Sequence, residues 1–269
     1  MKYDPIKKGL GNVFNRTPFL RKIFYRLLDL LLLRAWHIKR ELRRARRQVG
    51  EEGEVLDAGS GFGQFIFFMS RLSRKWRIKG VDVKEDQVQD CNEFFSRIGE
   101  HDRVRFETAD LTRFREEGKY HLVLCVDVME HILEDAEVFR NFSFSMKEGG
   151  ILLISTPSDL GGSDVHDDHE DSFIEEHVRD GYNIEEIEDK LKTSGFSEVL
   201  ARYSYGWPGR ISWRLSMKYP VIMLNSSKLF YVLLPFYYLL TLPFSIVLNC
   251  LDVRLKHKTG TGLIVKAVK

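Results

Sequence analysis

The chain has 269 residues, 43% of them hydrophobic and 30% charged, with a formal net charge of +2. This length and composition are typical of one large globular domain, or of one domain that carries an insertion. Three scattered cysteines, Cys91, Cys125 and Cys250, lack any C-x-x-C spacing, which argues against a disulfide framework or a zinc finger and favours a reducing compartment.

The small net charge conceals an uneven distribution of charge along the chain. Residues 1–50 carry 14 Lys/Arg against 3 Asp/Glu, and residues 198–269 carry 10 against 2. Residues 51–197 carry 17 Lys/Arg against 34 Asp/Glu. Two basic, apolar-rich ends thus flank an acidic middle, and such ends are attracted to anionic lipid head groups or to nucleic acid.

Residues 16–48 are predicted to form one long helix that starts at Thr17-Pro18. Apolar residues recur at helical spacing from Leu20, and five arginines between Arg40 and Arg47 close the run. Two interpretations stay open: the arginines are the solvated end of a packed helix, or they meet lipid phosphate from an interfacial helix. Nucleic-acid binding is disfavoured, because no aromatic residues interleave with the arginines to form a stacking surface.

From residue 54 the pattern changes to short apolar strands that alternate with amphipathic helices. The predicted helices lie near residues 62–73, 84–98, 130–146 and 183–195. The predicted strands are 54–58, 77–82, 103–108, 121–127, 150–156, 196–206 and 261–269. Such alternation predicts an α/β fold in which helices cover both faces of a mostly parallel sheet.

A glycine-rich turn, "VLDAGSGFGQF" (55–65), joins the first strand to a helix. Its three glycines let the backbone approach a ligand closely and take positive φ. The spacing G-x-G-x-G matches neither the dinucleotide fingerprint nor the P-loop. Asp57 precedes the glycines, and Asp82 ends the next strand 25 residues later, where a carboxylate suits hydrogen bonds to ribose hydroxyls.

In these residues the sequence resembles the class I, Rossmann-like S-adenosylmethionine-dependent methyltransferases, over about residues 50–206. "VLDAGSGFG" and "GVDVKEDQV" resemble the first two motifs of that class, and "ETADL" (107–111) resembles the third. "LVLCVDVMEHI" (122–132) and "MKEGGILLISTPS" (146–158) resemble the fourth and fifth. The resemblance implies a seven-stranded, mostly parallel sheet and S-adenosylmethionine as the cofactor. The cofactor-binding residues that it implies are Asp57, Gly59, Gly61, Gly63, Asp82, Val83, Asp110, Leu111 and Val126.

The resemblance implies a role for several of these positions. The glycine-rich turn, supported by Asp57, would pass beneath the methionine part of the cofactor, and Asp82 would hold the ribose. Asp110 would lie beside the adenine amino group, and Val126 would offer its backbone at the end of the fourth strand.

The fourth motif contains "DVMEH" (127–131), which resembles the E-x-x-E-H stretch of the ubiquinone-pathway O-methyltransferases, the type closest in motifs. The resemblance implies that Asp127, Glu130 and His131 could hold Mg²⁺ or Zn²⁺ and activate an acceptor oxygen. Asp127 stands where that type has Glu, which shortens the reach by one methylene. The alternative is a Glu-His pair that caps a helix or contacts substrate without a metal.

An acidic stretch, residues 161–183, follows the fifth strand and carries three histidines and eight Asp/Glu. Its position at the carboxyl ends of the strands is where α/β folds bind substrates. His166 and His169 are therefore candidate general bases, because an imidazole titrates near neutrality, and His131 of the fourth motif is a further candidate catalytic residue. The alternative interpretation is a solvated acidic loop.

The stretch "LFYVLLPFYYLLTLPFSIVLNCL" (229–251) has 23 residues and no charge, a length that suits a transmembrane helix. It lies between the predicted sixth and seventh strands, so a single crossing would separate two strands of one sheet. Two crossings need roughly 40 apolar residues. Residues 219–251 number only 33 in all, with one charge, Lys228, and Pro235 and Pro243 are expected to break the helix. A helical hairpin is predicted, either dipping into one leaflet or forming an apolar cap or a dimer interface.

The expected organisation is a basic amphipathic helix over residues 1–50, a methyltransferase domain over 51–206 plus 259–269, and an apolar insertion over 207–258. The expected function is methyl transfer, preferably to oxygen, on a hydrophobic, lipid-like acceptor. The protein is expected in the cytoplasm, peripheral or monotopic at the inner face of an anionic membrane. Nucleic acid is not an expected partner, since the middle of the chain is acidic. A soluble small-molecule methyltransferase and a non-catalytic membrane-attached scaffold are the alternatives.

Overall fold

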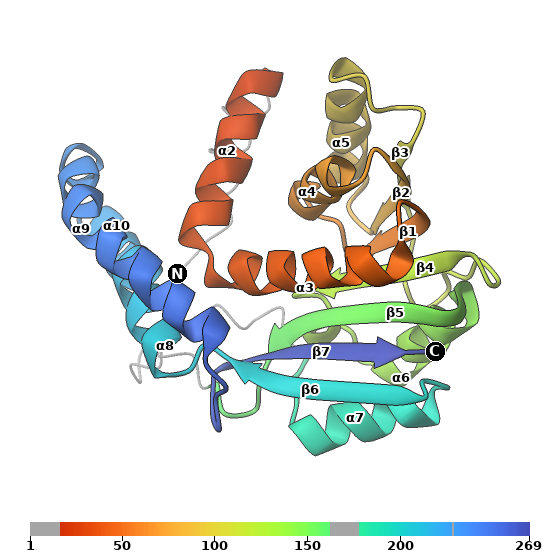
Figure 1. The fold of residues 1–269 in the computed structure, drawn as a ribbon. Helices are drawn as coiled ribbons and strands as arrows, with labels where there is room; N and C mark the ends of the chain where they lie inside the picture. Colours follow the sequence, from red (N-terminus) through yellow and green to blue (C-terminus); the bar gives the residue numbers. More distant parts are fainter. Residues whose placement is uncertain (1–16, 162–177, 228) are drawn as a thin grey trace.

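Seven strands form one sheet in the order β3-β2-β1-β4-β5-β7-β6 (Figure 1). The computed structural model describes residues 17–161, 178–227 and 229–269. Strand β7 runs antiparallel to β5 and β6, and the remaining neighbours pair in parallel. The predicted sheet is thereby confirmed. The strands are β1 (Glu52–Ala58), β2 (Lys75–Asp82), β3 (Val104–Thr108), β4 (Tyr120–Val126), β5 (Met146–Pro157), β6 (Glu198–Ser204) and β7 (Gly262–Val268).

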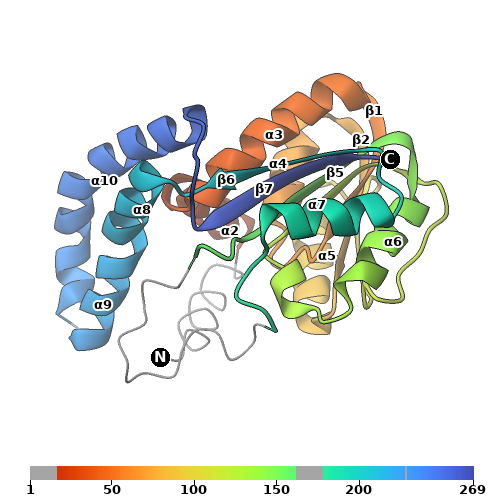
Figure 2. The same ribbon diagram turned by 90° about the horizontal axis from the view of Figure 1, so that it is seen from below.

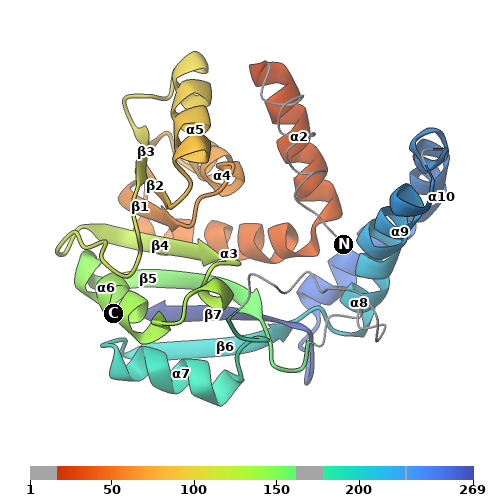
Figure 3. The same ribbon diagram turned by 180° about the vertical axis from the view of Figure 1, so that it is seen from behind.

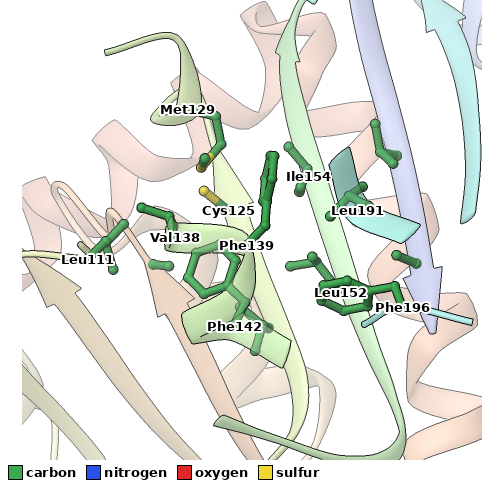
Figure 4. Packing of buried hydrophobic residues seen from close by; sticks show 14 of the residues in the cluster. Leu111, Cys125, Met129, Val138, Phe139, Phe142, Leu152, Ile154, Leu191 and Phe196 are labelled. Carbon is green, nitrogen blue, oxygen red and sulfur yellow. The ribbon is translucent and has the colours of Figure 1, made fainter. Parts of the chain in front are cut away.

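Helices cover both faces of the sheet, which explains why the central strands are apolar without alternation. On one face lie α3 (Leu33–Val49), α4 (Gln64–Leu72) and α5 (Glu85–Arg97), and on the other lie α6 (Asp135–Ser145) and α7 (Ile184–Thr193) (Figures 1 and 2). Successive residues of β4 alternate between the two cores: Leu122 and Leu124 join the α3–α5 cluster, and Val123 and Cys125 join the α6–α7 cluster. Figure 4 shows the second cluster, where Phe139 and Phe142 of α6 pack against the strands.

The predicted single N-terminal helix is in fact two. Helix α2 (Pro18–Leu31) ends at Leu32, whose ψ of 109° is extended, and α3 begins at the next residue in another direction (Figure 1). Helix α3 packs on the sheet through Ile38, Leu42 and Ala45, all buried. Arg43, Arg44 and Arg47 of α3 stay exposed. This packing favours the interpretation of a packed helix with a solvated basic end.

The insertion between β6 and β7 is a helical hairpin. Its first arm consists of α8 (Trp207–Trp213), the π-helix η2 (Arg214–Lys218) and α9 (Tyr219–Ser226), and α10 (Phe230–Arg254) is its second arm. We refer to these elements together as the hairpin. Figure 3 shows it projecting from the end of the sheet, with α2 between it and α4 and α5. Ser204 and Gly262 are register partners in the β6–β7 pair, so the chain leaves and re-enters the sheet at neighbouring points.

The expected break at the two prolines is wrong, because α10 continues through both Pro235 and Pro243. A proline removes one amide donor and crowds the carbonyl four residues earlier, which can bend a helix without ending it. Figure 2 shows α10 changing direction along its length. By length and composition alone, α10 is the one helix of the described chain that could cross a membrane, and 6% of its most apolar window is buried.

Candidate active site

The glycine-rich turn after β1 adopts backbone conformations that glycine favours. Gly59, Gly61 and Gly63 have φ of 81°, 48° and 74°. The amides of Gly59 and Ser60 both donate to the carbonyl of Val81 at the end of β2, at 2.8 and 2.9 Å. A Cβ at Gly59 would lie 2.1 Å from a methyl of Val128, the second residue after β4. The turn therefore fits closely between the carboxyl ends of β2 and β4.

Asp82 fixes the middle of this turn. One of its carboxylate oxygens accepts the amide of Gly61 at 2.8 Å, and the other accepts the amide of Lys84 at 3.0 Å. The neighbouring Val83 side chain is 66% exposed, unusual for valine and suited to stacking against a flat apolar ring. The acid thus holds the turn and still presents lone pairs at the edge of the sheet.

The third motif continues the same edge after β3. The Asp110 carboxylate accepts the amide and the hydroxyl of Thr112, at 2.9 and 2.8 Å, and these hydrogen bonds lower its pKa. Leu111 is buried in the core beneath (Figure 4), so only its backbone is available to a ligand at this edge. Val126 ends β4 nearby. The structure therefore brings the predicted cofactor residues to the carboxyl ends of four adjacent strands, while their individual roles stay predictions.

Two buried polar atoms at this turn have no partner in the described chain. Asp57 is 2% exposed and its Oδ2 makes no hydrogen bond, and the hydroxyl of Ser60 is likewise unpaired. Burial, followed by the nearby charge of Asp82, raises the pKa of Asp57 to about 8. A cationic ligand would return this carboxyl to its charged form. The residues therefore fit the cofactor that the resemblance implies, because S-adenosylmethionine carries an ammonium and a sulfonium.

Sequence reasoning missed the contribution of α2, which is fastened to the turn by Arg21 and Tyr25. The Arg21 guanidinium, 3% exposed, donates to the carbonyls of Phe62 and Asp90, each at 3.0 Å, and lies 4.8 Å from the Phe94 ring centroid. The Tyr25 hydroxyl also donates to the carbonyl of Phe62. The sequence offered one signal for this role: an arginine and a tyrosine four residues apart on the apolar side of a helix. A cation at such a position needs buried hydrogen-bond partners.

The three predicted metal ligands do not converge. Asp127, at a φ of 51°, is ion-paired with Arg34 of α3, and Glu130 accepts the Thr156 hydroxyl at 3.2 Å in the interior. Burial, and then Asp127, raise the pKa of Glu130 to about 8, whereas His131 faces solvent. The short 3₁₀ turn Met129–His131 directs successive side chains differently. The residues that the structure describes contain no group of three His, Cys, Asp or Glu able to hold a metal ion, so the predicted metal site is not supported.

The carboxyl end of β6 completes this edge. Tyr205 has a φ of 55°, which is rare for an aromatic residue, and its hydroxyl accepts the amide of Arg34 at 3.0 Å. One residue of α3 thus contacts Asp127 after β4 and Tyr205 after β6. Of the candidate general bases, His131 lies at this edge, and His166 and His169 fall outside the described residues.

The comparisons with known proteins agree with this geometry. Residues 50–200, more than half of the chain, match the family described as "Methyltransferase domain". A phosphoethanolamine N-methyltransferase of Triticum aestivum is 28% identical over 149 residues, which cover 55% of this chain and 28% of that protein. A ubiquinone biosynthesis O-methyltransferase of Shewanella pealeana is 25% identical over 103 residues, 38% of this chain and 43% of that one.

Among solved structures, the fold is similar to Haemonchus contortus phosphoethanolamine N-methyltransferase 2 in complex with S-adenosyl-L-methionine. The TM-score is 0.57 at 18% identity, covering 86% of this chain and 52% of that chain. The chain spans less than a third of the length of the wheat relative it matches. The matched region contains the glycine-rich turn, Asp82 and the fourth motif. The chain therefore belongs to the methyltransferase domain family.

Proposed function

We propose that this protein is an S-adenosylmethionine-dependent methyltransferase whose acceptor is hydrophobic, lipid-like and reached at a membrane surface. The observation that carries the proposal is the position of the hairpin. It leaves β6 at Ser204 and returns to β7 at Gly262, at the same edge of the sheet as the glycine-rich turn. The apolar insertion and the cofactor turn are therefore parts of one end of the molecule.

The cofactor, when bound, supplies an electrophilic methyl group, so the chain has to align an acceptor with it and accept a proton. Asp82 and the turn would fix the cofactor, and Asp57 would face its cationic part. The acceptor would enter from the side of β4 and β6, where Asp127, Arg34 and Tyr205 lie. The general base stays a prediction among His131, His166 and His169.

The exposed surface of α10 supports an apolar acceptor. Leu239, Leu240 and Phe244 are 74%, 71% and 67% exposed, and such a large exposed apolar patch marks a binding surface. The resemblance of "DVMEH" favours oxygen as the acceptor atom, while the wheat relative is named for transfer to nitrogen. Fragmentation of the methylated product would assign the atom. A non-catalytic scaffold is disfavoured, because the turn and both acids are intact.

Labelled methyl transfer tests the proposal. Purified protein is incubated with methyl-tritiated S-adenosylmethionine and a total lipid extract in detergent micelles, and tritium in the re-extracted lipid is counted. We expect incorporation with the native protein and a loss of at least tenfold with Asp82→Ala, because the turn loses its carboxylate contact. Asp102→Ala, which removes a carboxylate that is 90% exposed, is the matched control. Tritium in water-soluble metabolites alone would show a soluble small-molecule enzyme. If calorimetry detects no binding of S-adenosylmethionine, the proposed methyltransferase activity is refuted.

A further inference from the structure

Helix α10 is polar on its buried side and apolar on its exposed side. The hydroxyls of Tyr237 and Tyr238 donate to the carbonyls of Leu215 and Ser216 in η2, at 2.7 and 2.8 Å. Further along, Ser245, Asn249 and Asp252 are 1%, 1% and 0% exposed. A helix in water normally has the opposite arrangement. This inverted polarity indicates that the exposed side of α10 faces an apolar medium.

The exposed side forms one continuous stripe with helical spacing. It consists of Val232, Phe236, Leu239, Leu240, Phe244 and Val247, all at least 59% exposed, and we call these six residues the apolar stripe. Arg254 follows at the same helical spacing, seven residues beyond Val247, and is exposed at the foot of the helix. The stripe therefore ends in a cation.

The charges of the insertion are almost all positive. Residues 207–258 contain seven Lys/Arg, and the one acidic residue in this sequence range, Asp252, is fully buried. Asp252 is hydrogen-bonded to His37 of α3, whose ring nitrogen lies 2.8 Å from Oδ1, and it accepts the amides of Tyr205 and Gly209. The charge exposed on the described residues of this insertion is therefore cationic, which is complementary to anionic lipid head groups.

The path of the chain determines how the hairpin can meet a bilayer. Its two ends are side by side in the sheet, so one crossing is excluded. The first arm cannot supply a second crossing, because Arg210, Arg214 and Lys218 recur every four residues along it. Insertion by the tip would bury the polar residues Asn225, Ser226 and Ser227 in hydrocarbon. What remains is contact along the length of α10.

We propose that the hairpin lies parallel to the surface of an anionic membrane, with the apolar stripe among the acyl chains and the basic residues at the level of the phosphates. The partner is a lipid bilayer that carries negative head groups. This inference deepens the proposed function and rests on it only for the nature of the acceptor. In this orientation, an amphiphilic acceptor could reach the edge of β4 and β6 without leaving the leaflet. Attachment itself does not depend on catalysis.

Vesicle flotation tests the attachment. The full-length protein is mixed with vesicles of phosphatidylcholine alone, or of phosphatidylcholine and phosphatidylglycerol at 7:3. We expect at least tenfold stronger partitioning onto the anionic vesicles, and a further dependence on salt. Lys256→Glu with Lys258→Glu, just beyond α10, should weaken partitioning about 30-fold or more, since each basic residue near the surface contributes about fivefold. Arg47→Glu with Arg74→Glu, two exposed residues outside the insertion 207–258, is the matched control and should leave partitioning unchanged.

Depth measurements test the orientation. Val232→Cys, Leu240→Cys and Val247→Cys, each in a Cys250→Ala background, are labelled with an environment-sensitive dye and quenched by nitroxide lipids of known depth. Residues 232 and 247 are about 22 Å apart along a helix axis. A helix in the plane places all three labels at similar depth, whereas a tip-first hairpin would give depths that differ by most of this distance. Glu198→Cys on β6 should remain in water.

Each result decides between the alternatives. Anionic-selective binding, three similar depths and loss of binding in Leu240→Ser with Phe244→Ser support the inference. Equal partitioning onto both vesicle types, graded depths or no partitioning overturns it. A dimer in gel filtration that dissociates in Leu240→Ser with Phe244→Ser would also overturn it, by showing that a second copy covers the stripe. The methyl-transfer assay uses micelles and does not require attachment to a bilayer. Methyl transfer can therefore be observed without vesicle binding, and vesicle binding without methyl transfer, so the experiments distinguish failure of one proposal from failure of the other.

Discussion

At the scale of single residues, Asp57 is the acid at the turn whose protonation its surroundings alter. It is 2% exposed, its Oδ2 has no partner in the described chain, and its pKa is raised to about 8. The ordinary value for an unfolded aspartate is about 3.9. Since the folded pKa is the higher one, the folded cofactor-free protein prefers the protonated acid. Asp57 therefore lowers the free energy of unfolding by a growing amount as pH rises from about 4 to about 8.

Asp57→Asn should separate stability from binding. Above pH 8 the cofactor-free variant should unfold a few degrees higher than the native protein, because ~2 kcal/mol or more of unfavourable burial is removed. Below about pH 4 the two should unfold alike. The variant should bind S-adenosylmethionine at least tenfold more weakly, since the anionic partner of the cofactor is lost. Thermal melts from pH 4 to 9 and calorimetry measure both effects, and unchanged affinity would contradict the role given to Asp57.

At the scale of elements, α2 is a cover whose position is set by one buried arginine. Arg21 reaches Phe62 in the turn and Asp90 in α5 at once, so it joins α2 to two neighbouring elements. Further along α2, the side-chain amide of Gln64 in α4 donates to the Asp29 carboxylate at 2.7 Å, which links these two helices as well. If the cofactor binds in the turn as predicted, α2 adjoins its site, because Arg21 and Tyr25 contact Phe62 there. Release of the cofactor would therefore require α2 to move.

Arg21→Met keeps the apolar bulk and removes these donors. It should destabilise the protein by about 1.5–3 kcal/mol, the range for hydrogen bonds to charged groups, and weaken cofactor binding about tenfold. Hydrogen exchange should rise in α2 before it rises in the sheet. Arg26→Met, at an exposed position one turn further along the same helix, serves as control and should change neither quantity. An unaltered cofactor affinity in Arg21→Met would refute the covering role.

The elements also show which features a sequence can predict. The strands and the glycine-rich turn were predictable, because an apolar run or a G-x-G-x-G spacing is a local property. The break at Leu32 was not, since it depends on distant partners: Ser216 donates to the carbonyl of Leu31 at 3.4 Å, and Arg34 donates to Tyr205. The metal prediction failed for a related reason. Spacing placed Glu130 and His131 together, but the 3₁₀ turn buries one and exposes the other.

At the scale of the whole molecule, the hairpin is joined to the sheet through the neighbouring ends of β6 and β7, and it also contacts α3. Ser204 and Gly262 pair directly, and the foot of the hairpin is held by Asp252, which contacts His37, Tyr205 and Gly209. The core clusters on the two faces of the sheet are built almost entirely from residues outside the hairpin. The sheet and its cofactor turn should therefore persist without it.

Replacement of residues 207–258 by a short Gly-Ser turn tests this division. The variant should fold, bind S-adenosylmethionine within a fewfold of the native affinity, and melt several degrees lower, because His37 loses its buried partner. Methyl transfer to extracted lipid should fall at least tenfold. Circular dichroism, calorimetry and the tritium assay report these outcomes. Full transfer activity without the hairpin would show that the acceptor does not use it.

The pairing of Ser204 with Gly262 also bears on the order of events during folding. Strand β6 lies at the edge of the sheet and its neighbour is β7, which follows the hairpin in the chain. An unstructured connection of this length would make the meeting of the two strands entropically costly and slow. If the hairpin forms first, the ends of β6 and β7 are already close together and only a short loop remains to be closed. The segment that we propose for membrane contact would thus also set the pace at which the last two strands are added.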